Sequence, residues 1–189
     1  MRREDNMTNA MTGPAKTTLM WSAILGLTAA VGSYGLACVF PFAALAALAA
    51  ITLPTRQAAV LMGAVWGVNQ IVGFTILSFP QDAQAYAWGF IIAAAAFVAL
   101  GAAKIVFGRG TKLVSLRSGA ALAASIVAYQ VVMFVGAYAL DGFESSTPEI
   151  VATVARNDML WFIGLGAFRI ALGTALPRWF GSAQTLRTA

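Results

Sequence analysis

The chain has 189 residues, of which 60% are hydrophobic and only 10% are charged. Soluble domains carry about 25% charged residues, so this chain cannot cover a water-facing surface with polar groups, and we interpret it as an integral membrane protein. One cysteine and no histidine exclude a disulfide framework and argue against zinc sites of nitrogen and sulfur ligands. We attribute the net charge of +5 to cytoplasmic loops and not to nucleic-acid binding.

Apolar segments follow one another along most of the chain, and a helix needs about 20 such residues to cross the hydrocarbon layer. Five segments meet or approach this length: residues 18–37, 57–79, 85–103, 119–140 and 159–176. A sixth segment, residues 42–53, is much shorter, but the distribution of charges requires it to cross as well. The prediction is an all-α membrane protein, a six-transmembrane-helix bundle at residues 17–177 between cytoplasmic tails at residues 1–16 and 178–189.

The charges indicate that both termini lie in the cytoplasm, because basic residues concentrate on that side of membrane proteins. The outer loops then hold one basic residue, Arg156. The acidic residues on that side are Asp82, Asp141, Glu144 and Glu149, with Asp158 at the boundary. The basic residues on the inner side are Arg2, Arg3, Lys16, Arg56, Lys104, Arg109, Lys112, Arg117, Arg178 and Arg187. The expected location is the bacterial inner membrane, with the lipid bilayer as a partner.

The short second span lies in the sequence GLACVFPFAALAALAAITLP. Its twelve residues cover about 18 Å, well short of the ~30 Å hydrocarbon core. Pro41 suits the first turn of a helix, so the residues from Cys38 to Phe40 must run extended. Extended backbone at membrane depth must be buried in protein or line a cavity. Cys38 and Phe40 are therefore candidate walls of a cavity open to the outside, with Trp88 at its mouth; a tight hairpin at the interface is the alternative.

Three spans carry polar residues at a similar predicted depth. Asn69 and Gln130 lie about 18 Å from the cytoplasmic ends of their helices, Gln70 is beside Asn69, and Arg169 is about ten residues into the last span. A charge at the bilayer centre costs about 2.5–3.5 kcal/mol. We therefore expect Arg169 to donate to the amide oxygens of these residues, to backbone carbonyls or to an anionic ligand. The alternative role for the amides is hydrogen bonding between helices.

Groups for catalysis and proton coupling are missing from this predicted layer. It contains no Asp, Glu or His, and the chain lacks the GxxxxGK[ST] loop that cradles ATP phosphates. We find no nucleophile–base pair and no cluster of metal ligands. The protein is therefore predicted not to be an enzyme and to hold no cofactor or metal. Energy for moving a solute would come from a partner or from the solute's own gradient.

Small residues recur at a spacing of four in the first two spans, which lets helix backbones approach closely. They are Ser22, Gly26 and Ala30, then Ala43 with Ala47 and Ala46 with Ala50. With this pattern and topology the chain resembles the substrate-binding S components of energy-coupling-factor vitamin transporters. The resemblance implies a vitamin-type ligand near the outer face and transmembrane and ATPase partner subunits. A cobalamin would suit Cys38, and a carboxylate vitamin such as biotin would suit Arg169 better.

A structural or assembly subunit of a larger inner-membrane complex is the alternative function. In that case the small-residue stripes form the interface with partner proteins, and the polar layer only ties helices together.

Overall fold

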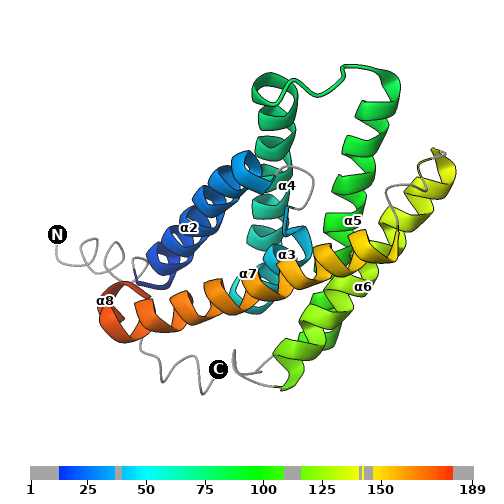
Figure 1. Ribbon diagram of the computed structural model, residues 1–189. Coiled ribbons are helices and arrows are strands. Elements are labelled where there is room, and N and C mark those ends of the chain that lie inside the picture. Colours follow the sequence, from blue (N-terminus) through cyan, green and yellow to red (C-terminus); the bar gives the residue numbers. More distant parts are fainter. Residues whose placement is uncertain (1–12, 37–39, 109–115, 141, 143–146, 181–189) are drawn as a thin grey trace.

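All regular elements in the described part of the chain are helices, as predicted (Figure 1). This computed structural model describes residues 13–36, 40–108, 116–140, 142 and 147–180. The elements are α2 (Gly13–Leu36), α3 (Phe42–Thr52), α4 (Thr55–Ile71), the π-helix η2 (Val72–Ile76), α5 (Ala83–Phe107), α6 (Leu116–Ala139), α7 (Pro148–Ala175) and α8 (Pro177–Phe180).

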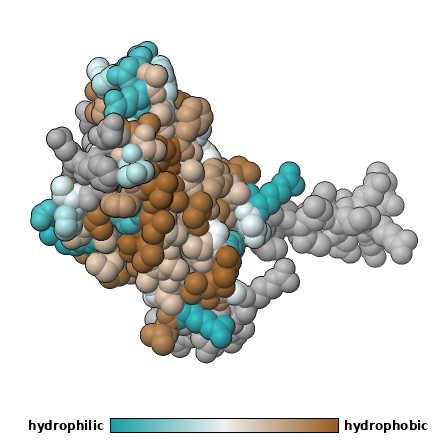
Figure 2. Space-filling view, turned by 90° about the vertical axis from the view of Figure 1, so that its right-hand side faces the viewer, coloured by the Kyte–Doolittle hydropathy of each residue, from teal (hydrophilic) through white to brown (hydrophobic). Residues whose placement is uncertain are grey.

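Four of these helical segments are long and apolar enough to cross a membrane, namely α4 with η2, α5, α6 and α7. Large apolar side chains point outward from them; Phe90 of α5 is 68% exposed and Ile163 of α7 is 65% exposed. Figure 2 shows the result as a hydrophobic surface over the middle of one face, with hydrophilic residues toward the upper end and the margins. Soluble proteins rarely expose so much contiguous apolar surface, so the fold is compatible with a multi-pass membrane protein.

The short helix α3 lies inside the bundle, and α4, α5, α6 and α7 pack around it. Every residue from Phe42 to Ala50 is buried. A helix that is apolar on all sides is suited to this position, and its alanines allow the neighbouring backbones to come close. The segment that is too short to span the bilayer alone is therefore surrounded by protein.

The N-terminal end of α3 is held by side chains from two neighbouring helices. The Ala44 N–H donates to Oδ1 of Asp158 on α7 at 2.8 Å, and the Ser125 hydroxyl on α6 donates to the Ala43 carbonyl at 2.8 Å. The first amides of a helix lack partners within the helix, so a buried helix end needs such an acceptor. The carboxylate also complements the positive end of the helix dipole.

The C-terminal end of α3 is held in the complementary way. The Lys104 ammonium group on α5 donates to the Leu53 carbonyl at 2.7 Å, and the Trp21 indole on α2 donates to the Thr52 hydroxyl at 2.9 Å. A cation at this end complements the negative end of the dipole. Both ends of the buried helix are thus fixed by groups of the appropriate charge.

Helix α7 begins earlier than the sequence pattern predicts. The last span was expected at residues 159–176, but α7 starts at Pro148, where the Thr147 hydroxyl accepts the Ile150 N–H at 3.4 Å and proline occupies the first helical position. The helix runs obliquely across α3 in Figure 1. Arg169 therefore lies 21 positions from the start of α7, about 32 Å along the helix, and six positions from its end.

Candidate ligand-binding cavity

A cavity of about 570 Å³ lies between the end of α4, η2, the start of α5, the second half of α6 and the start of α7. The residues just before and at the start of α3 complete its wall. This volume lies in the range of small-molecule sites. Of the residues expected from the sequence to bind a ligand, the cavity brings together Phe40, Asn69, Gln70, Trp88 and Gln130. Cys38 lies outside the described residues.

Two neighbouring carboxamides form one polar part of the wall. Gln70 Nε2 donates to Asn69 Oδ1 at 3.3 Å. Gly89 on α5 leaves the room for Gln70, because a Cβ at Gly89 would lie 2.5 Å from Gln70 Oε1. The Gly89 carbonyl in turn accepts the Trp66 indole N–H at 2.8 Å. The close approach of α4 and α5 at this glycine therefore sets the position of the Gln70 amide.

A third carboxamide, that of Gln130, enters the wall from α6. Its Nε2 is buried and has no hydrogen-bond partner. An unsatisfied buried donor costs about 1–3 kcal/mol, so an acceptor on a bound molecule would stabilise this arrangement. A carboxamide offers both donors and acceptors, which suits ligands with amide-type groups.

Aromatic rings form a second, apolar part of the wall. The Phe40 and Phe42 rings pack edge to face with centroids 4.6 Å apart, and Phe42 stacks on Tyr129 at 6.1 Å. Trp88 lies against Gly142, where a Cβ would come within 2.7 Å of the indole ring. These surfaces favour flat, apolar molecules, because rings stack on one another with little loss of side-chain freedom.

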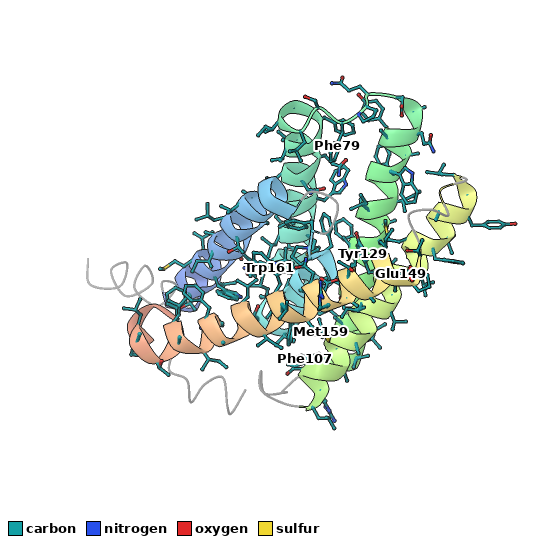
Figure 3. The ribbon with its side chains drawn as sticks, viewed as in Figure 1. Phe79, Phe107, Tyr129, Glu149, Met159 and Trp161 are labelled. Carbon is teal, nitrogen blue, oxygen red and sulfur yellow. The ribbon has the colours of Figure 1, made fainter. Side chains whose placement is uncertain are left out.

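The π-helix η2 shapes the upper edge of the cavity. The Leu77 N–H bonds to the Val72 carbonyl and the Phe79 N–H to the Gly73 carbonyl, both at 3.0 Å, while Ser78 takes a left-handed φ of 54°. This turn brings Phe79 back over Gly73, where a Cβ would meet the ring at 2.8 Å. Figure 3 shows Phe79 near the α4–α5 connection and Tyr129 deeper in the bundle. π-Helical turns occur frequently at functional sites.

Arg169 does not line this cavity, contrary to the prediction of one polar layer with Asn69, Gln70 and Gln130. The side chain is 6% exposed, and its Nη2 donates to the Phe180 carbonyl at 3.0 Å. Its Cζ lies 5.5 Å from the Trp21 ring centroid and 5.6 Å from that of Phe180. The prediction counted depth from residue 159, whereas α7 begins eleven residues earlier, so Arg169 lies near the opposite end of the helix.

Asp158 is the residue that reading the sequence missed. It was assigned to the membrane boundary, but only 1% of it is exposed and it bonds to α3. The spacing of the buried residues of α7 holds a signal: Asp158, Leu165, Arg169 and Gly173 follow one another at intervals of seven, four and four. Such intervals place them on one face of a helix, so the acid and the arginine belong to the same inward-facing stripe.

The cavity carries no charged side chain among the described residues that line it. Comparison with known protein families, with curated proteins and with solved structures finds no match for this chain. A functional assignment therefore depends on the geometry and chemistry of the cavity.

Proposed function

We propose that the protein is a solute-binding component of a membrane transport system, with its ligand in the 570 Å³ cavity. The observation that carries this proposal is the convergence of aromatic rings and three carboxamides, two from α4 and one from α6, on one concave site. Binding sites for small molecules have this composition, mostly apolar with a few placed polar groups.

The ligand that fits this wall is an uncharged, planar heterocycle with amide-type groups. The rings of Phe42, Trp88 and Tyr129 supply stacking surfaces, and Gln70 and Gln130 supply donors and acceptors. A charged group placed here would lose its hydration with no counter-charge from the lining residues, which is costly. The cavity thus favours a different ligand from the carboxylate vitamin that a nearby Arg169 would suit.

The proposed topology has six crossings, both termini in the cytoplasm and the bacterial inner membrane as the location. The cavity is built from the end of α4 with η2, the start of α5, the second half of α6 and the start of α7. In this topology all four helix ends face outside, so a solute would enter from the outer side. Transmembrane and ATPase partner subunits, as in energy-coupling-factor transporters, or the solute gradient would supply the energy.

Equilibrium binding to the purified protein tests this proposal. Lumiflavin, an uncharged planar heterocycle with imide and carbonyl groups, should quench tryptophan fluorescence saturably and raise the melting temperature, since a ligand stabilises the state it binds. Its carboxymethyl analogue should bind more weakly, because the described residues that line the cavity offer the added carboxylate no cation. If neither lumiflavin nor other uncharged heterocycles bind, and the protein purifies in mild detergent with a larger complex, the assembly-subunit alternative is supported instead.

Matched variants locate the site. Trp88→Leu should abolish most of the quenching, whereas Phe90→Leu, two positions away on the exposed face of α5, should leave it intact. Gln130→Leu should weaken binding, and Val131→Leu on the exposed face of α6 is its control. If a variant and its control had equal effects in either pair, we would conclude that the ligand does not bind in this cavity.

A further inference from the structure

The carboxyl group of Asp158 has one oxygen that the fold leaves unused. Asp158 lies ten positions into α7, a helix long and apolar enough to cross a membrane, and is 1% exposed. Its Oδ1 accepts the Ala44 N–H at 2.8 Å, while its Oδ2 is buried without a hydrogen-bond partner. Buried polar atoms are nearly always partnered, so this oxygen requires an explanation.

In the described part of the chain, a negative charge on Asp158 is balanced by the first amides and the positive dipole end of α3 and not by a basic side chain. Helix α3 has no titratable residue, and the described side chains of α2 have none. Tyr129 of α6 is close enough to interact with Asp158 electrostatically. On α7 itself, Arg156 is exposed, Glu149 is exposed in the first turn, and Arg169 is eleven positions away between aromatic rings.

A proton suits this oxygen better than a metal ion does. Calcium and magnesium ions take about six or more oxygen ligands, and the described residues hold no group of three His, Cys, Asp or Glu side chains. A proton needs only the one oxygen that is free. Acidic residues inside membrane helices commonly mark proton pathways.

The first turn of α3 connects Asp158 to the cavity. Ala44, its hydrogen-bond partner, lies two positions after Phe42, and both Phe42 and Phe40 line the cavity. The Phe42 ring stacks on Tyr129, which also lines it. An ionised carboxylate accepts a stronger hydrogen bond than a neutral carboxyl group does. The charge on Asp158 therefore bears directly on how firmly this wall is held.

We propose that Asp158 binds a proton and that its occupancy is coupled to the cavity through the first turn of α3, so that solute binding is linked to H⁺. The proton site stands independently of the proposed function, whereas the link to a solute rests on it.

Infrared difference spectroscopy of the reconstituted protein tests the proton site without a ligand. The carbonyl band of a protonated carboxylic acid should titrate in the wild type and in Glu149→Gln, the exposed acid on the same helix, and should be lost in Asp158→Asn. Should Asp158→Asn not fold, wild-type protein with ¹³C-labelled aspartate decides, since a labelled buried aspartic acid shifts the band. An unshifted band, or the same titration in wild type and Asp158→Asn, overturns the proposal.

Fluorescence and binding test the coupling. The fluorescence of Trp88 is the part of the tryptophan signal that Trp88→Phe removes. It should change with pH in the wild type and not in Asp158→Asn. A pH-independent signal, or the same pH dependence in both proteins, overturns the coupling.

The affinity for lumiflavin should change by up to about tenfold per pH unit in the wild type, which is the limit for one linked proton, and should not change with pH in Asp158→Asn. Lumiflavin binding that is flat in both proteins overturns this proposal and leaves the proposed function standing. If no solute binds although the infrared titration and the pH-dependent Trp88 fluorescence are both present, the proposed function is overturned and the proton site stands.

Discussion

Two buried ionisable groups on α7, eleven residues apart, have different surroundings. Arg169 lies between the rings of Trp21 and Phe180 and donates through Nη2 to the Phe180 carbonyl, while its Nε and Nη1 are buried without a hydrogen-bond partner. Asp158 accepts one amide N–H from α3 and keeps one buried oxygen without a partner. Aromatic faces stabilise a cation at any pH, whereas a carboxyl group with a free oxygen changes its charge when it takes a proton.

The position of each charge explains this difference. Arg169 joins α7 to α2 and α8 and packs the end of the bundle away from the cavity. Asp158 joins α7 to the part of α3 next to the cavity wall. We infer that Arg169 stabilises the fold and that Asp158 belongs to the functional part of the molecule. Variants of Arg169 should therefore affect stability, and variants of Asp158 should affect the cavity.

The largest effect on stability is expected from Arg169→Ala. The change removes a desolvated cation from two ring faces and leaves a gap between them, so unfolding should become easier by about 2 kcal/mol or more. Thermal unfolding in detergent measures this, and the lumiflavin affinity of the folded fraction should be unchanged. Arg156→Ala, at an exposed position of the same helix, is the control and should leave the melting temperature as it is. Loss of binding in folded Arg169→Ala would place the arginine in the site after all.

The next effect is expected at the cavity itself, from Gly89→Ala. The new methyl group would lie 2.5 Å from Gln70 Oε1 and must displace that carboxamide. Loss of one well-placed hydrogen bond corresponds to about a tenfold weaker affinity for lumiflavin. Gly101→Ala on the same helix meets nothing within 4 Å and serves as the control. Equal affinities of the two variants would exclude Gln70 from ligand contact.

The smallest effect is expected from Lys104→Met, which acts at the end of α3 opposite to Asp158. It removes the hydrogen bond to the Leu53 carbonyl but keeps the aliphatic stem, so the loss of stability should be about 1 kcal/mol. The pH dependence of the Trp88 signal should persist, because the cavity lies at the other end of α3. If Lys104→Met abolished the pH dependence of the Trp88 fluorescence, as Asp158→Asn is expected to do, a change at either end of α3 would affect the cavity.

Much of the helical fold could be predicted because its signals are local. Runs of apolar residues identified the long helices, and Pro41 marked the start of the buried short helix. Asn69, Gln70 and Gln130 stood out because polar side chains are rare in such runs, and these residues do line one cavity with Phe40 and Trp88. Each of these inferences needed only the residue and its immediate neighbours.

Composition and periodicity are sufficient to show that the chain is apolar and helical, where most of its helices lie and which amides interrupt them. Three features depend on packing and could not be read from these patterns: α7 begins at Pro148, Arg169 lies between rings away from the cavity, and Asp158 bonds to the first turn of α3. Depth counted along one helix depends on where that helix starts, and it does not specify which neighbour a side chain meets. Those contacts exist only once α2, α3, α7 and α8 are packed together.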